Sequence, residues 1–250
     1  MRHRTNSRIL VLMVAVILTA CTVALSQRAL PNLDTEIAMG RETAREIEQR
    51  VRWIQDPVVT EYINRVSQTL VRNSDAVVPF TIRVVDSDEV NVMALPGGFL
   101  FVNKGLILAT DNEAELAGVI AHEIAHVTAR HAARQAQGGD LLRNGVPGII
   151  VQQAASIGVP ITFIAFNRGA ETEADSLGLQ YLAKAGYDPA AMVRSFQKLR
   201  ASKVSNLFST HTAGEERLAQ VQQNIAANLP ARTQAPVSPA EFDAVKARLR

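Results

Sequence analysis

The sequence predicts an α+β fold that is mostly α-helical, with one small β-sheet beside a central helix. Apolar residues recur at helical spacing, between capping residues, over most of residues 34–228. Residues 80–86 instead alternate as a strand does, and residues 99–103 form a short apolar strand pattern. The run at residues 113–135 predicts a long helix that contains the segment HEIAH. These patterns favour a helical domain organised around that helix.

The N-terminal half predicts two helices followed by three strands. The first helix has an apolar stripe, and Asp56 and Pro57 are typical of the cap and first turn of the second. Pro96, Gly97 and Gly98 break the backbone between the last two strands. The predicted elements are helices at 34–54 and 57–72 and strands at 80–86, 91–95 and 99–103.

The C-terminal half predicts further helices. Thr110 or Asp111 would cap the HEIAH helix, and Gly138 with Gly139 would end it. Residues 140–166 are apolar but repeatedly broken by Gly and Pro, so short core or cover helices are favoured over a membrane span, which needs about 20 apolar residues. The remaining predicted helices are 167–185, 189–200, 212–228 and a short one that begins near Pro239.

The N-terminus resembles an export signal, with a basic start followed by an apolar stretch. Leu18-Thr19-Ala20-Cys21 resembles a bacterial lipobox, and Cys21 is the single cysteine of the chain. Ordinary cleavage near residues 24–26 and an uncleaved anchor are the alternatives. We expect a lipoprotein signal peptide at 1–20, a lipid-anchored tether at 21–33, the main folded domain at 34–228, and a linker with a short helix at 229–250.

The charge balance argues against a nucleic-acid partner. The formal net charge is +2, and Arg2, Arg4 and Arg8 lie in the signal segment. Without these three residues, 23 basic residues stand against 24 acidic ones. The slight excess of positive charge therefore belongs to the targeting signal and predicts no nucleic-acid surface. The 47% hydrophobic composition is ample for a core.

The segment HEIAH carries the clearest chemical signal. Residues on a helix advance about 100° each, so His122 and His126 lie about 40° apart on one face and can hold a single metal ion. Glu123 lies beside them. Two neutral imidazoles, an open position for water and a carboxylate that can take a proton from the water are the set that catalytic zinc requires.

A zinc site needs a third protein ligand. His131 would lie about 180° around the helix from His122, which favours a structural or surface role. Glu171 and Asp175 share a face of the next predicted helix, whereas Glu173 points elsewhere. Glu171 can then bind the metal while Asp175 accepts a hydrogen bond from a ligand histidine. A solvated acidic helix face is the alternative.

HEIAH, the segment Glu171-Thr172-Glu173-Ala174-Asp175, Asn167-Arg168 and the stretch from Asn91 to Gly98 together resemble gluzincin metallopeptidases of the CAAX prenyl protease, HtpX and BepA family, in particular its soluble BepA-like branch. The resemblance implies that residues 34–228 form a zinc metallopeptidase domain of the zincin type, with the sheet beside the HExxH helix, one zinc ion, and Glu171 as third ligand. It also implies a substrate cleft in which an edge strand, 91–95 or 99–102, binds an extended peptide. The expected cleft residues are Asn91, Met93, Ala94, Gly97, Gly98 and Phe99.

His211 lies in Ser209-Thr210-His211, which resembles a segment of the BepA-like branch. The resemblance implies that its imidazole approaches the zinc, either as an inhibitory fourth ligand or as a donor to the tetrahedral intermediate. A loop histidine without such a role is the alternative. Arg217 would follow as the usual basic residue of the next helix, with a structural role.

The expected function is that of a zinc-dependent endopeptidase that cleaves unfolded or misassembled envelope proteins, with Glu123 as general base. Its location would be the periplasm-facing bacterial envelope, more readily the outer than the inner membrane, with an envelope assembly machinery as a possible partner. One alternative is a zinc-containing chaperone or adaptor whose peptidase centre is closed by His211. Another is an integral membrane enzyme.

Overall fold

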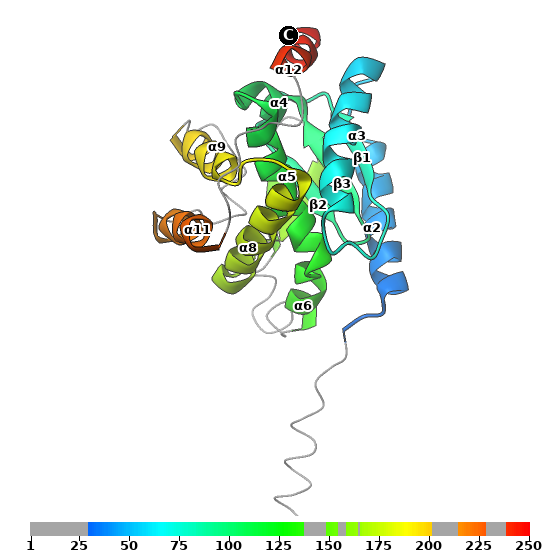
Figure 1. Cartoon of the computed structure of the whole chain (residues 1–250). Helices are drawn as coiled ribbons and strands as arrows, with labels where there is room; N and C mark the ends of the chain where they lie inside the picture. Colours follow the sequence, from blue (N-terminus) through cyan, green and yellow to red (C-terminus); the bar gives the residue numbers. More distant parts are fainter. Residues whose placement is uncertain (1–29, 138–148, 155–158, 165, 202–214, 229–238) are drawn as a thin grey trace, which may run out of the picture. The chain divides into compact units, whose positions relative to one another are not determined.

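The computed structural model describes residues 30–137, 149–154, 159–164, 166–201, 215–228 and 239–250. The chain divides into residues 1–31 and a compact unit, 32–250, that holds every helix and strand named below (Figure 1). These elements are α2 Leu33–Glu48, α3 Pro57–Arg72, β1 Thr81–Val85, β2 Val92–Leu95, β3 Phe99–Asn103, α4 Lys104–Ala109, α5 Glu113–Thr128, α6 His131–Gln137, β4 Ile149–Ala154, β5 Val159–Ile164, α8 Arg168–Ala185, α9 Ala190–Ala201, α11 Glu215–Asn228 and α12 Pro239–Arg248. The predicted α+β class, mostly helical with a small sheet, is confirmed.

The three-stranded sheet has the order β1-β3-β2, with β1 parallel and β2 antiparallel to β3. The turn between β2 and β3 uses two glycines at positive φ, +79° at Gly97 and +89° at Gly98. A Cβ atom at Gly97 would lie 2.7 Å from the Cα of Ile37 on α2. The turn is therefore packed directly against α2, and β2 becomes an edge strand of this sheet.

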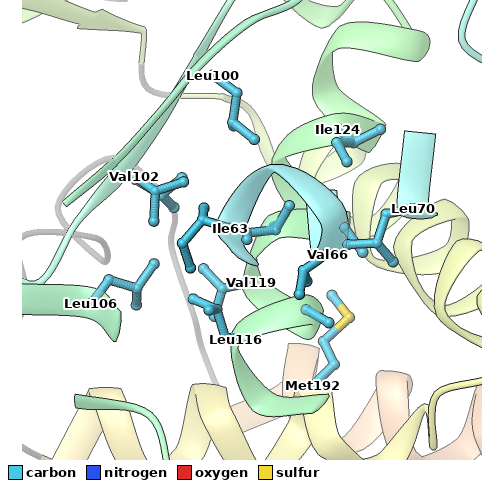
Figure 2. Close-up of a cluster of buried hydrophobic side chains, with 14 of the residues drawn as sticks. Ile63, Val66, Leu70, Leu100, Val102, Leu106, Leu116, Val119, Ile124 and Met192 are labelled. Carbon is cyan, nitrogen blue, oxygen red and sulfur yellow. The ribbon is translucent and has the colours of Figure 1, made fainter. Parts of the chain in front are cut away.

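The two faces of the sheet pack against different helices. Leu95 and Phe101 meet Ala44 and Ile47 of α2 in one apolar cluster. On the opposite face, side chains from β3 join the main core, to which α3, α4, α5 and α9 contribute (Figure 2). The residues labelled there are Ile63, Val66, Leu70, Leu100, Val102, Leu106, Leu116, Val119, Ile124 and Met192. Because side chains alternate between the two faces along β3, one face of the sheet packs against α2 and the other against the main core that contains α5.

Helix α5 is the centre of the compact unit. It packs against α3, β2, α8 and α9 (Figure 1). Its residues from Leu116 to His126 are all buried. Close approach is possible because glycines stand where backbones meet. A Cβ atom at Gly118 would lie 2.8 Å from the Cα of Met192 on α9, and one at Gly178 would lie 3.2 Å from the backbone nitrogen of His122. Burial on all sides of this stretch is what is expected of a helix in the centre of a core.

Several predicted boundaries are confirmed and others need correction. Asp56 caps α3, Asn167 caps α8, and Gly186 ends α8 at a φ of +92°. Asn112, rather than Thr110 or Asp111, caps α5 by accepting a hydrogen bond from the backbone N–H of Glu115. The predicted long helix also stops at Thr128, and Arg130 has a φ of +55° before α6 begins.

The prediction of short helices in residues 140–166 is wrong for the part that the structure describes. Residues 149–154 and 159–164 form an antiparallel pair, β4 with β5, in which Ile149 pairs with Ile164. The physical reason is visible in the composition, because both segments are rich in the β-branched residues Ile, Val and Thr. Among the described residues, no helix has the length and apolar character needed to cross a membrane.

Helix α12 packs on the same core as the rest of the unit. Phe242 and Val245 are buried in the main cluster, and the ring of Phe242 lies 6.0 Å from that of Tyr62 on α3. Arg248 donates to Asp56, the cap residue of α3, at 2.6 Å. The division of the chain into signal, tether, peptidase domain and C-terminal segment stays a prediction.

Replacement of Gly118 by Ala should lower the free energy of unfolding by about 1–3 kcal/mol, because the added methyl group collides with the backbone of α9. Urea unfolding followed by circular dichroism measures the effect. The control is exposed position 180 on α8, where Gln180→Ala should be more stable than Gln180→Gly by about 1 kcal/mol through helix propensity alone. If alanine were more stable than glycine by the same amount at positions 118 and 180, the result would contradict the close packing of α5 on α9.

Candidate metal centre

Helix α5 presents both histidines of HEIAH on one side. The Nε2 atoms of His122 and His126 lie 3.0 Å apart, and both side chains are buried. The predicted 40° separation on one helical face is what makes this approach possible. Glu123, the next residue after His122, is buried as well. Apolar residues surround this part of α5, so the polar groups stand in an otherwise water-poor core.

Helix α8 supplies the third group. Asn167 accepts a hydrogen bond from Ala170 and starts the helix, which places Glu171 in the first turn. The carboxylate oxygens of Glu171 lie 3.6 Å from Nε2 of His122 and 3.5 Å from Nε2 of His126. Within the described part of the chain, His122, His126 and Glu171 are the group of side chains whose donor atoms converge closely enough to hold a metal ion.

The hydrogen bonds behind the two imidazoles fit a metal between them. Nδ1 of His122 lies 3.0 Å from Asp175, and Nδ1 of His126 lies 2.9 Å from Nδ1 of His131. A neutral imidazole that donates through Nδ1 leaves a lone pair on Nε2. Two such lone pairs 3.0 Å apart repel each other unless a cation lies between them. Two imidazole nitrogens and one carboxylate are also a donor set of catalytic zinc.

Asp175 occupies the predicted position behind His122. Burial acts to raise the pKa of the Asp175 carboxyl group, but hydrogen bonds from Arg217 and His122 outweigh burial and lower it. The group is therefore an acceptor for the Nδ1–H of His122, which fixes the tautomer that leaves Nε2 for the metal. The structure thus brings together His122, His126, Glu171 and Asp175.

Arg217 of α11 is closer to the site than its expected structural role implied. Its guanidinium group makes two contacts with Asp175, at 2.5 and 2.8 Å, and one with Glu171, at 2.5 Å. Burial acts to lower the pKa of Arg217, yet the neighbouring carboxylates, Asp175 first, raise it. Arg217 consequently stays charged and compensates the negative charge that two buried carboxylates would otherwise concentrate here.

His131 was predicted to lie on the far side of the HEIAH helix, in a structural or surface role. The helix ends before it, so the 180° projection does not apply, and the imidazole is buried beside His126. Its Nε2 lies 3.3 Å from Glu173 on α8. Burial is the largest influence on His131 and lowers its pKa, which favours the neutral ring. The residue with positive φ at the break is Arg130 rather than a glycine, so the sequence contains no signal for the end of the helix.

The expected cleft residues occupy several different places. Val92 and Ala94 of β2 pack toward the core cluster that contains α5, whereas Met93 and Phe99 pack against the cluster under α2. Asn91 is buried, and its side chain accepts a hydrogen bond from the N–H of Val92. The two glycines, 97 and 98, form the turn described above. Their assignment to a substrate cleft stays a prediction, and the alternation places the side chain of Ala94 on the face of β2 that packs toward the main core.

The alternative edge strand, residues 99–102, is excluded by the strand order, because β3 has a strand on each side. On β2, Asn91 accepts a bond from the N–H of Asn103, so 91 and 103 form a hydrogen-bonded pair. Pairing alternates along an antiparallel ladder, and the N–H and C=O of Ala94 therefore point away from β3, to the side of β2 on which no strand of the described residues pairs with it. Cys21 and His211 lie outside the residues that the structure describes.

Comparison with known proteins agrees with this geometry. The sequence profile described as Peptidase family M48 matches residues 56–225. The chain is 36% identical to a beta-barrel assembly-enhancing protease of Yersinia pestis, over 80% of this chain and 46% of that protein. It is 33% identical to the protein of the same name from Escherichia coli (strain K12), over 76% of this chain and 44% of that protein.

A more distant relative is the mitochondrial metalloendopeptidase OMA1 of Schizosaccharomyces pombe, which is 29% identical over 66% of this chain and 52% of that protein. The chain thus spans about half the length of the curated relatives that it matches.

Replacement of Asp175 by Asn should weaken zinc binding by about 10–100-fold, because the amide no longer serves as a charged acceptor for His122. Competition with a chromogenic chelator measures the affinity. Asp243→Asn, at an exposed position of α12, is the matched control and should leave the affinity unchanged. An unchanged affinity in Asp175→Asn itself would mean that His122 holds its orientation without the carboxylate.

Proposed function

The chain belongs to peptidase family M48, and we propose that it is a zinc endopeptidase that cleaves unfolded or misassembled proteins of the bacterial envelope. The observation that carries the proposal is the convergence of His122, His126 and Glu171, with Glu123 next to the first ligand on α5. Zinc in this donor set lowers the pKa of water toward about 7 and polarises a substrate carbonyl group.

Glu123 performs the proton transfers in this proposal. A carboxylate held beside the zinc ligands, in a buried and water-poor setting, accepts a proton from the attacking water and returns it to the leaving amine. Glu171 and Asp175 are engaged by Arg217, so their charges are committed to metal binding and to orientation of His122. Glu123, which follows the first ligand in HEIAH, is therefore the carboxylate that we assign to general base catalysis.

Strand addition along β2 supplies the substrate selection. The outward N–H and C=O of Ala94 can each bond to a peptide that lies alongside, and β2 packs against α5. Only an extended segment can form such a ladder. The substrate class is therefore a chain that exposes unpaired backbone, as unfolded and stalled proteins do.

The setting in the cell follows from the sequence and from the relatives. Two relatives from bacteria carry the name beta-barrel assembly-enhancing protease, which favours substrates from the assembly of outer-membrane β-barrels. Strands of such barrels have the exposed edges that β2 would bind before the barrel closes. Lipid attachment at Cys21, after the signal segment, would hold the enzyme at the periplasmic side of the outer membrane.

Glu123→Gln should bind zinc with the affinity of the wild type and lower kcat on unfolded casein by about 10²–10⁴-fold, because the amide cannot accept a proton. Glu61→Gln, at an exposed position of α3, should keep full activity. Full proteolysis by zinc-loaded Glu123→Gln would overturn the mechanism. Client binding that survives in Glu123→Gln, with little cleavage by the wild type until His211 is replaced by Ala, would instead support the chaperone or adaptor alternative.

Ala94→Pro should lower kcat/KM on an unfolded protein by about fivefold or more, because proline removes an outward N–H worth about 1 kcal/mol and blocks the neighbouring bond. Proline at an outward-facing position of an edge strand leaves the ladder to β3 intact. Ala94→Ser keeps the N–H and should behave like the wild type. Equal loss in both variants would assign the effect to the side chain and contradict strand addition.

A further inference from the structure

The two metal-ligand histidines are supported from behind by different groups. His122 meets a buried carboxylate, Asp175, at 3.0 Å. His126 meets a second imidazole, that of His131, with 2.9 Å between the two Nδ1 atoms. His131 is only 2% exposed, and it is not one of the three residues whose donor atoms converge on the metal position. Nothing in the proposed mechanism uses it.

The protons in this chain can be arranged in one consistent order. His126 directs Nε2 toward His122 and Glu171, so its Nδ1 carries the proton and donates to Nδ1 of His131. His131 then carries its own proton on Nε2, where Glu173 of α8 lies 3.3 Å away. Arg134 donates to the same carboxylate oxygen of Glu173 at 2.8 Å. Each N–H group in this series thus faces an acceptor, and the carboxylate of Glu173 is the last acceptor.

The fold makes this contact by interrupting a helix. If α5 continued through residue 131, that side chain would project to the opposite side from His122. Instead the backbone turns at Arg130, whose φ is +55°, and an ion pair joins Arg130 to Glu36 on α2. A positive φ at a residue other than glycine is unfavourable, so surrounding contacts must hold it. The break brings the imidazole of His131 back toward the site.

Phe166 covers the two imidazoles. Its ring stacks on that of His126 with 4.0 Å between centroids and lies 5.8 Å from that of His131. An aromatic cover limits water at the two Nδ1 atoms, which favours the direct contact between them.

We propose that His131, backed by Glu173, is a positioning residue that fixes the tautomer and the ring orientation of His126 for metal binding. The inference rests on the proposed metal centre and extends it. The residue that supports His122, Asp175, is buried in the core and is only 1% exposed. The support of His126 instead ends at a carboxylate whose side chain is 43% exposed. The metal is thus connected to the surface of α8 through His126, His131 and Glu173.

The test measures the zinc affinity of four variants. His131→Leu removes the acceptor at similar size and should weaken zinc binding by about 10–100-fold. His131→Gln restores an acceptor oxygen and should recover most of the loss. Glu173→Gln keeps His131 but weakens its support, and should lower the affinity by a smaller factor. Glu61→Gln is the matched exposed control and should not change it.

Nitrogen-15 NMR of the histidine side chains adds a second measurement, because a loss of packing alone would not change which nitrogen of His126 carries the proton. The zinc-loaded wild type should show His126 protonated at Nδ1, and His131→Leu should shift or broaden that signal while His122 keeps its own. Wild-type affinity together with an unchanged His126 signal in His131→Leu would overturn the proposal.

If His131→Leu does not fold, Glu173→Gln decides, because this residue is largely at the surface. In that case wild-type affinity and an unchanged His126 signal in Glu173→Gln overturn the proposal. These readouts do not depend on proteolysis. A wild-type protein that binds no zinc would overturn the proposed function first, whereas normal zinc binding in all variants would overturn only the positioning role.

Discussion

The close packing of α8 on α5 is the constraint on which the site depends. A Cβ atom at Gly178 would lie 3.2–3.3 Å from the backbone of Ala121 and His122, so a larger residue there would press on the helix that carries the ligands. Glu171 lies two turns before Gly178 on the same rigid helix. The distance between the two backbones therefore sets where the carboxylate meets the imidazoles. A shift of the helices by a few tenths of an ångström would be felt at all three ligands.

Burial of so many ionisable groups is tolerable because most of them form ion pairs or hydrogen bonds with one another or with a neighbouring residue. His122, Glu123, His126, Glu171 and Asp175 are all buried around one point. Arg217, from α11, engages two of the carboxylates, and the imidazoles donate to Asp175 and to His131. Unpaired charges in this setting would cost several kcal/mol each. The same low dielectric strengthens every interaction with a metal ion, so the arrangement that is costly to bury also favours metal binding.

The site features that could be predicted from the sequence are those that depend on the geometry of a single helix. His122 with His126, and Glu171 with Asp175, are pairs at i, i+4, and their shared faces follow from helical geometry alone. His131 could not be placed in this way, because an ion pair between Arg130 and a residue 94 positions earlier holds the helix break. Arg217 and the β4–β5 pair likewise depend on contacts between segments far apart in the chain.

The selectivity of the proposed enzyme follows from where its substrate-binding edge lies. The outward groups of Ala94 are backbone atoms, and hydrogen bonds to a backbone are nearly independent of the side chains of the substrate. Discrimination then rests on conformation, because a folded protein has its backbone groups paired already. Since β2 packs on the helix that carries HEIAH, a chain that extended along β2 would, in this proposal, lie beside that helix. A peptidase built in this way needs no sequence motif in its substrate, which is the property that removal of misassembled proteins requires.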